Sequence, residues 1–184
     1  KEILDFMMLW SDNLLADRLA GLAARAAGYS PNIKGIEIIF RTLLAQFEID
    51  DSKLVVADAS GLSKKNKITA KLMGELLYKI RKDERYALLY ESLPIGGVSG
   101  TLQSRFTTTA PSAVGLVRAK TGTLNGTATL AGYVQSTDRE YVFVTLADDI
   151  AKGNAALNKA RAAIDRVLGR IAAPNIPAEI SPAP

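Results

Sequence analysis

Two short runs of polar residues in this sequence carry side chains that suit acyl-transfer chemistry. Ser11-Asp12-Asn13 comes directly before an amphipathic segment, and Lys120-Thr121-Gly122-Thr123 lies in a strand-like segment just ahead of an Asn-Gly turn. A lysine can attract a carboxylate, and a second cation beside a lysine can depress its pKa so that it activates a serine hydroxyl. We therefore expect the two runs to meet in one site that transfers an acyl group.

The second run offers a residue for each task at the substrate-binding side of such a site. Lys120 would be the second cation and would attract a substrate carboxylate, to which the hydroxyls of Thr121 and Thr123 would donate hydrogen bonds. Gly122 has no side chain, so a substrate backbone can lie beside the strand. The backbone N–H of Thr123 would point at the scissile carbonyl as an oxyanion donor. We expect all four residues to bind substrate, and Lys120 and Thr123 to be catalytic.

The first run would handle the proton and the substrate amide. Ser11 would bridge the leaving-group nitrogen and a lysine, and Asn13 would orient the substrate amide and the catalytic lysine. A structural interpretation stands beside this one, because Ser11 and Asn13 are also common helix N-cap types. Lys120 could likewise be a surface strand lysine, and Gly122 could mark a β-bulge before the turn. The chemical interpretation is favoured because the two runs occur together, each in a suitable context.

The sequence contains no histidine and no cysteine. These absences exclude a Ser-His-Asp mechanism, a thiol nucleophile and almost every zinc site. Acid–base chemistry at neutral pH must then use a lysine, a carboxylate or a hydroxyl relay, and we predict neither a metal nor another cofactor. The net charge of +4 could favour an anionic polymer such as cell wall. No nucleic-acid-binding motif accompanies that charge, so we predict no nucleic-acid partner.

Hydrophobic periodicity predicts helices that cover an antiparallel sheet, which is an α+β fold. The Asn125-Gly126 pair predicts a tight turn within a three-stranded meander, and a short buried strand is expected within 53–63. The predicted helices are 14–28, 33–49, 69–93 with a break near 82–85, and 154–173, and the predicted meander strands are 114–120, 127–135 and 141–147. The first meander strand would leave a long apolar edge unpaired, so we expect further strands to complete the sheet.

Four longer segments give the sequence a family resemblance. They are SDNLLADRLA (11–20), DASGLSKKNKIT (58–69), LPIGGVSGTLQSRF (93–106) and AKTGTLNGTATLAGYV (119–134). Together they resemble the C-terminal half of the penicillin-binding D-alanyl-D-alanine carboxypeptidases/endopeptidases, in the low-molecular-mass group with a large insertion between the first and second motifs. S-D-N and K-T-G also belong to class A β-lactamases, but the last three segments separate the sequence from those enzymes.

The resemblance implies a penicillin-binding-protein/β-lactamase-like transpeptidase fold, with a five-stranded antiparallel sheet between helical layers. It implies a bacterial, extracytoplasmic enzyme that acts on peptidoglycan stem peptides. A serine would be acylated with release of D-alanine, and the acyl-enzyme would be hydrolysed. β-Lactam antibiotics such as penicillin would be covalent inhibitors. By position, Ser11 and Asn13 take the roles of the second motif, and Lys120, Thr121 and Thr123 those of the third.

Two further expectations follow from the same resemblance. Asp58 and Ser60 lie in a loop typical of the family, and we expect them to shape the site. The family's first motif, S-x-x-K, occurs nowhere in the 184 residues; in the family it lies upstream, on a helix that follows the first two strands. The sequence also starts without an initiator Met. We therefore expect an N-terminal part of the same protein to supply the nucleophile and the remaining strands, and this chain alone to be inactive.

The expected organisation is a C-terminal part of the transpeptidase-like domain over 1–173, followed by a Pro-rich tail over 174–184. Two other functions remain open. The chain could belong to a protein that binds wall peptides without turnover, which an intact nucleophile in an associated part would exclude. It could also belong to a β-lactamase or esterase on the same fold. The SGLS and GTLQSRF segments argue against that alternative, as does the absence of an obvious deacylating Glu near Ser11.

Overall fold

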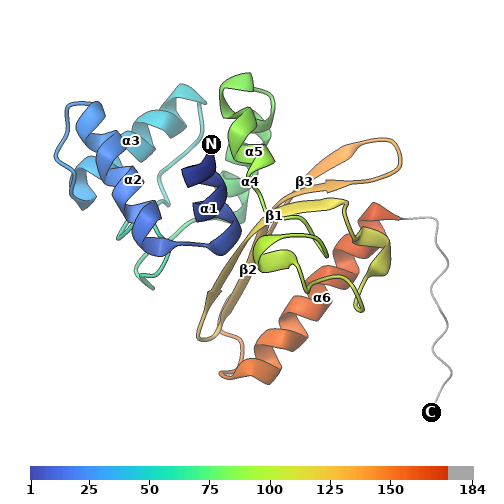
Figure 1. The fold of residues 1–184 in the computed structure, drawn as a ribbon. Coiled ribbons are helices and arrows are strands. Elements are labelled where there is room, and N and C mark those ends of the chain that lie inside the picture. The colour runs from blue at the N-terminus through green and yellow to red at the C-terminus, as the bar shows by residue number, and fades with distance from the viewer. Residues whose placement is uncertain (174–184) are drawn as a thin grey trace, which may run out of the picture.

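The computed structural model describes residues 1–173, and the predicted Pro-rich tail over 174–184 lies outside them. Within the described part, a three-stranded sheet lies at the centre and helices lie around it (Figure 1). The α-helices are α1 (Glu2–Trp10), α2 (Asn13–Ala26), α3 (Ile33–Gln46), α4 (Ala70–Arg81), α5 (Ala87–Glu91) and α6 (Asn154–Ala172). Short 3-10 helices are η1 (Glu84–Tyr86), η2 (Gly100–Leu102) and η3 (Pro111–Ala113).

The sheet is an antiparallel meander in the order β1-β2-β3. Its strands are β1 (Val117–Leu124), β2 (Thr127–Gln135) and β3 (Glu140–Ala147). Asn125-Gly126 makes the turn between β1 and β2, and Gly126 has a φ of 89°, a conformation that favours glycine. The register places Lys120 opposite Ala131. The predicted α+β class and three-stranded meander are therefore confirmed.

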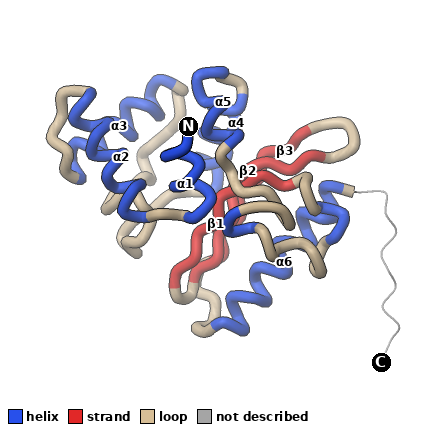
Figure 2. Tube along the Cα trace, in the orientation of Figure 1, coloured by secondary structure: helices blue, strands red, loops and turns tan. Residues whose placement is uncertain are grey.

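The two faces of the sheet are covered by different helices. On one face α6 packs on β1 and β2, and on the other Tyr133 of β2 packs against Met8 of α1. Figure 2 shows α1 to α5 grouped together, with α6 apart from them across the strands. Because side chains alternate along a strand, β1 presents Val117 and Ala119 to α6 and sends its even-numbered residues to the other face. The buried cluster under α6 contains Val117, Ala119, Leu130, Val134, Ile164 and Leu168.

The free edges of the sheet differ from the prediction. The first half of β1 is paired with the segment 94–96: Ala119 N–H donates to the Pro94 carbonyl, and Gly96 N–H donates to the Val117 carbonyl, both at 2.9 Å. Only the second half of β1, from Lys120 on, has an open edge. The prediction of a long unpaired edge on the first strand is therefore wrong for half its length. A second open edge belongs to β3, which has no strand partner on its outer side within residues 1–173.

The prediction of a short buried strand within 53–63 is wrong. One isolated bridge joins Val55 to Lys67, and 44% of Val55 is exposed. The rest is a loop whose backbone N–H groups donate to the side chains of Asp58 and Asn66. The apolar residues there signal a strand, but within residues 1–173 this segment forms only the isolated bridge and joins no sheet. The predicted break in the helix over 69–93 is confirmed, since α4 ends at Arg81 and α5 begins at Ala87.

A buried ion pair fixes the loop after η2 to helix α6. The Arg105 guanidinium donates to both carboxylate oxygens of Asp165, and its side chain is 12% exposed while that of Asp165 is 4% exposed. Arg105 also donates to the Arg161 carbonyl at 3.2 Å, and Thr109 donates its hydroxyl to Asp165 at 3.1 Å. Both partners are therefore paired and hydrogen-bonded, as buried charges require.

Replacement of Gly132 tests the close contact between β1 and β2. A Cβ at this position would lie 2.2 Å from the Arg118 carbonyl oxygen and 2.6 Å from Ala119 Cα. We expect Gly132→Ala to lower the free energy of unfolding by about 1–3 kcal/mol, because the packed strands cannot separate without loss of contacts. Urea denaturation of the complete protein, which comprises these 184 residues and any flanking sequence, measures this free energy.

The matched control for this change is Gly74→Ala in α4. A Cβ there would meet only Val144 Cγ2, at 3.8 Å, and alanine is the better helix former by about 0.8–1 kcal/mol. The control should therefore be at least as stable as the parent. Equal stabilities for the two variants would contradict the packing described here.

Replacement of Asp165 tests the buried ion pair. Asp165→Asn leaves the Arg105 charge buried without its counter-ion, so we expect a loss of about 3–5 kcal/mol in the free energy of unfolding. The control is Asp138→Asn, because Asp138 pairs with Arg139 at the surface, where the two side chains are 59% and 64% exposed. Such an exposed pair contributes little to stability, because water screens it. A similar effect for both substitutions in urea denaturation would show that the buried pair adds no stability.

Candidate active site

A cleft of about 960 Å³ brings the two polar runs together. It is bounded by the open half of β1, the junction between α1 and α2, the loop at 59–62, the segment after η2 and the face of α6. Ser11, Asn13 and residues 120–124 all line it, although more than a hundred positions separate the two runs. The prediction that the runs meet at one place is therefore confirmed.

The junction between α1 and α2 turns sharply at Ser11. Ser11 has φ 57° and ψ 48°, the left-handed conformation that costs a residue other than glycine about 1–2 kcal/mol. Asp12 caps α2 by accepting a hydrogen bond from Leu15 N–H at 2.8 Å. The structural interpretation in which Ser11 or Asn13 caps this helix is therefore wrong. Asn13 lines the cleft, and its side chain makes no hydrogen bond within residues 1–173.

Lys120 reaches across the cleft to that junction. Its Nζ donates to Ser11 Oγ at 2.6 Å and to the Thr121 carbonyl at 3.0 Å. Burial lowers the pKa of the Lys120 ammonium, because desolvation disfavours the charged form. The alternative of a surface strand lysine is therefore wrong: Lys120 is a partly buried cation that is hydrogen-bonded to a serine hydroxyl.

The two threonines lie on the opposite face of β1 from Lys120. Thr121 donates its hydroxyl to Thr101 Oγ1 at 2.9 Å, and Thr123 Oγ1 accepts from Arg161 Nη2 at 3.0 Å. Because Ala119 N–H points away from β2 toward Pro94, the alternation of an antiparallel strand turns the N–H groups of Thr121 and Thr123 toward the same open edge. Within residues 1–173, the backbone N–H of Thr123 thus has no partner and is a donor at the edge of the cleft.

Gly122 has a packing role in addition to the one predicted. A Cβ at Gly122 would lie 2.3 Å from Thr129 Oγ1, which donates to the Gly122 carbonyl at 3.3 Å. Gly122 pairs with Thr129 in regular register, so the β-bulge alternative is wrong. The strand can therefore tolerate only glycine at this point without displacement of Thr129.

Asp58 and Ser60 lie differently with respect to the cleft. The Asp58 carboxylate accepts hydrogen bonds from Gly61 N–H, Ser63 N–H and Asn66, so it organises the loop from within. Asp58 is absent from the cleft lining, whereas Ser60 belongs to it. The Oγ of Ser60 is buried and has no hydrogen-bond partner within residues 1–173.

Sequence reasoning missed the residue that holds this loop in place. Asp17 of α2 accepts hydrogen bonds from the N–H groups of Ala59 and Ser60, both at 2.9 Å. Asp17 lies in the SDNLLADRLA segment on which the family resemblance rests, but it was assigned no role there. Arg161 and Thr101 were also missed. Thr101 lies in the LPIGGVSGTLQSRF segment but was assigned no role, and no local pattern marks Arg161.

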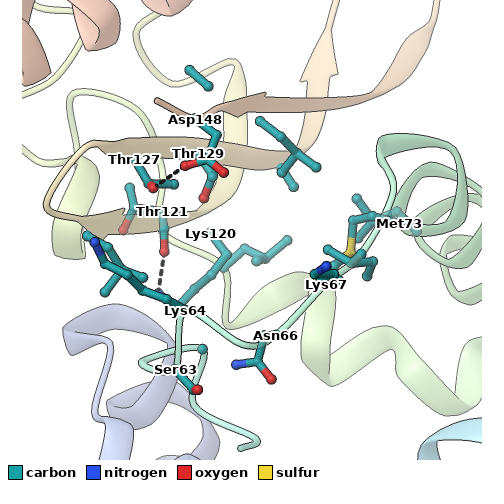
Figure 3. Close-up of a pocket in the computed structure, with 18 of the residues that line it drawn as sticks. Ser63, Lys64, Asn66, Lys67, Met73, Lys120, Thr121, Thr127, Thr129 and Asp148 are labelled. Carbon is teal, nitrogen blue, oxygen red and sulfur yellow. Dashed lines mark hydrogen bonds between the residues drawn. The ribbon is translucent and has the colours of Figure 1, made fainter. Parts of the chain in front are cut away.

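A second cavity adjoins Lys120 on the side away from α6. Its volume is about 980 Å³, and it extends between the sheet and helices α4 and α5. Figure 3 shows Lys120 and Thr121 at one side of it, with Lys67 and Met73 at the other. Its deeper lining is apolar and includes Met8, Met73, Leu77, Ile80, Leu93 and Tyr133. Lys120 and Thr121 line both cavities, so they lie where the polar cleft meets an apolar groove.

The described residues contain neither a metal-binding cluster nor a membrane-spanning helix. Residues 1–173 hold no group of three or more His, Cys, Asp or Glu side chains arranged to bind a metal ion. None of the helices in the same range has the length and apolar character needed to span a membrane.

Comparison with known proteins gives consistent matches. A model of the family described as D-Ala-D-Ala carboxypeptidase 3 (S13) matches residues 1–171. The chain is 39% identical over 145 residues to Carboxypeptidase DacB of Mycolicibacterium smegmatis, and 34% identical over 157 residues to D-alanyl-D-alanine carboxypeptidase DacB of Haemophilus influenzae. These alignments cover 77% and 83% of this chain but 31% and 32% of the relatives. The chain thus spans about a third of their length.

Solved structures agree with this assignment. The crystal structure of penicillin binding protein 4 from Haemophilus influenzae matches with a TM-score of 0.82 and 30% identity, over 91% of this chain and 38% of that chain. A predatory peptidoglycan endopeptidase of Bdellovibrio bacteriovorus shares the fold with a TM-score of 0.69 at 19% identity, over 92% of this chain and 42% of that chain. The expected transpeptidase-like fold is confirmed, and the chain belongs to the D-Ala-D-Ala carboxypeptidase 3 (S13) family.

Proposed function

We propose that this chain forms two sides of the active site of a penicillin-sensitive, serine-type D-Ala-D-Ala carboxypeptidase/endopeptidase that acts on peptidoglycan stem peptides. The observation that carries the proposal is the 2.6 Å hydrogen bond from Lys120 Nζ to Ser11 Oγ. This bond links a buried lysine and a serine hydroxyl in a protein without histidine, which is the pair that a lysine-dependent proton relay needs. The relatives named as D-alanyl-D-alanine carboxypeptidases support the substrate class.

In the proposed reaction, a nucleophilic serine outside these 184 residues attacks the carbonyl carbon of the penultimate D-alanine. The C–N bond to the terminal D-alanine breaks, and the serine's proton passes to the departing amine. Ser11 relays this proton with Lys120 beside it, because Ser11 Oγ can accept one proton while it donates another. Water then attacks the acyl-enzyme and releases the shortened peptide. Asn13, whose amide has no hydrogen-bond partner within residues 1–173, would hold the substrate amide and the catalytic lysine.

The substrate would lie along the open half of β1. The free N–H of Thr123 would donate to the oxygen that becomes negative in the transition state, which is the usual task of an oxyanion donor. The Thr121 hydroxyl would turn from Thr101 to donate to the substrate carboxylate, and Gly122 would leave room for the substrate backbone. Ser60, with its unpartnered hydroxyl, would shape the opposite side of the cleft, while Asp58 would act only through the loop.

The nucleophile would come from an N-terminal part of the same protein that carries S-x-x-K. Two features of this chain offer places for that part: the apolar groove beside Lys120 can receive a helix, and the outer edge of β3 can pair with further strands. Residues 1–173 would then be the C-terminal part of a larger transpeptidase-like domain, inactive alone. Because peptidoglycan lies outside the cytoplasmic membrane, such an enzyme would act in an extracytoplasmic compartment of a bacterium.

Labelling with a fluorescent penicillin tests this function. The complete protein should form a covalent adduct, and peptide mapping by mass spectrometry should place the adduct on a serine outside these 184 residues. It should also release D-alanine from a peptide that ends in D-Ala-D-Ala. Label on Ser11 or another serine of this chain would contradict the proposed origin of the nucleophile. Rapid penicillin hydrolysis would indicate a β-lactamase, and neither label nor D-alanine release would indicate a protein that only binds.

Replacement of Lys120 tests its place in the relay. We expect Lys120→Ala to slow penicillin acylation by about 2–4 kcal/mol in the activation barrier, because the variant loses a cation beside the reacting groups. The rate of label incorporation measures the effect. Lys159→Ala is the control, since Lys159 is an exposed lysine on α6 outside both cavities. Unchanged acylation in the Lys120 variant would remove Lys120 from the mechanism.

A further inference from the structure

The loop at 57–66 forms one wall of the cleft, and its residues 59–62 belong to the cleft lining. The large apolar side chain of this loop, Leu62, is 54% exposed. The buried hydrophobic clusters of residues 1–173 include no residue of the loop. Apolar packing therefore contributes little to the position of this wall, which must depend on hydrogen bonds.

Hydrogen bonds within the loop make it a firm unit. The Asp58 carboxylate accepts from the N–H groups of Gly61 and Ser63. Asn66 donates its amide to Asp58 at 2.7 Å, and its Oδ1 accepts from Ala57 N–H, also at 2.7 Å. These bonds fix the shape of the loop, but they do not fix its place relative to the rest of the cleft.

Asp17 attaches this unit to helix α2. Its Oδ1 accepts hydrogen bonds from Ala59 N–H and Ser60 N–H, both at 2.9 Å. Within residues 1–173, the other hydrogen bond from the loop to a distant segment runs from Lys64 to the Asn125 carbonyl, at 3.3 Å and exposed to solvent. The bonds to Asp17 are shorter and partly buried, so Asp17 is the main attachment.

The position of Asp17 on α2 relates the loop to a second wall of the cleft. Asp17 follows Asn13 by four residues, so the two side chains lie on the same face of the helix. Asn13 lines the cleft, whereas Asp17 does not. Asp17 is therefore not placed to contact a ligand, and it acts through the backbone of Ala59 and Ser60. The wall held in this way contains the Ser60 hydroxyl, which is buried and unpartnered within residues 1–173.

We propose that Asp17 is a positioning residue that sets the width of the cleft, because it holds the wall at 59–62 in a fixed place relative to Asn13. This inference rests on the proposed function, since it takes the cleft to be the place where the peptide substrate binds. Ser11 and Lys120 bond to each other without the loop. Release of the loop should therefore impair substrate binding and leave the proton relay intact.

Asp17→Ala tests this division in the complete protein, with a peptide that ends in D-Ala-D-Ala as substrate. We expect KM for D-alanine release to rise by about 5- to 50-fold, the value of one or two hydrogen bonds, with kcat little changed. Asp17→Asn keeps the Oδ1 acceptor that both N–H groups use, so it should restore KM to near the wild-type value. Hydrogen exchange of the Ala59 and Ser60 amides needs no substrate, and it should become fast in Asp17→Ala.

The matched control is Asn32→Ala at the start of α3. The Asn32 side chain likewise accepts from two backbone N–H groups, those of Lys34 and Gly35, and it lies outside both cavities. This variant should lose stability but keep the wild-type KM.

Three kinetic results would overturn the inference: an unchanged KM in Asp17→Ala, a loss in kcat as large as the rise in KM, or a KM in Asp17→Asn as high as in Asp17→Ala. Amide exchange that stays slow in Asp17→Ala would overturn the attachment itself. Failure of wild type to release D-alanine would instead overturn the proposed function, and with it the expected effect on KM.

Discussion

Strand β1 separates the site into two chemical environments. Its alternation sends Lys120 to the face where α1 and α2 meet, and Thr121 and Thr123 to the face covered by α6. Its open edge carries the N–H groups of the two threonines, since the segment 94–96 pairs only with the first half of the strand. One short strand thus presents a cation on one face, two hydroxyls on the other face, and backbone N–H donors at its open edge. Ser11 contacts the cation, and Thr101 and Arg161 contact the two hydroxyls.

The α1–α2 junction and the loop at 59–60 are held in place by Asp12 and Asp17, not by the polar side chains that line the cleft. Asp12 caps α2, so neither Ser11 nor Asn13 is needed for that purpose. Ser11 adopts a left-handed backbone conformation that costs free energy, and its hydroxyl accepts from Lys120. Strained residues of this kind persist where the surrounding structure holds them firmly, and they are common at functional sites. Asp17 fixes the opposite loop in a similar way, through backbone N–H groups rather than side chains.

The electrostatics of the cleft follow from burial. The pKa of the Lys120 ammonium is lowered by desolvation, and no carboxylate of residues 1–173 offsets that effect with an ion pair. On the other side of β1, the buried carboxylate in the cleft, Asp165, is already bound to Arg105. The positive charges that remain, on Lys120 and Arg161, form no ion pair within residues 1–173.

The sequence alone determined the elements whose signals are local. Helix periodicity located α2, α3, α4 and α6 to within a few residues, and Asn125-Gly126 located the β1–β2 turn, because helix faces and tight turns depend on neighbours in the chain. Motif types and their contexts also placed Ser11 and Lys120 in one site. Asp17 lay within a segment already singled out, although its contact with the 59–60 loop was not foreseen.

Only the tertiary structure decided which surfaces meet. The apolar residues near Val55 predicted a strand, but within residues 1–173 they join no sheet. The segment 94–96 pairs with the first half of β1 and covers that part of its edge. Arg161 is an ordinary arginine in an amphipathic helix until the packing of α6 brings it to Thr123. Strand pairing, loop closure and contacts between distant helices depend on long-range geometry, which residue types and spacing along the chain do not specify.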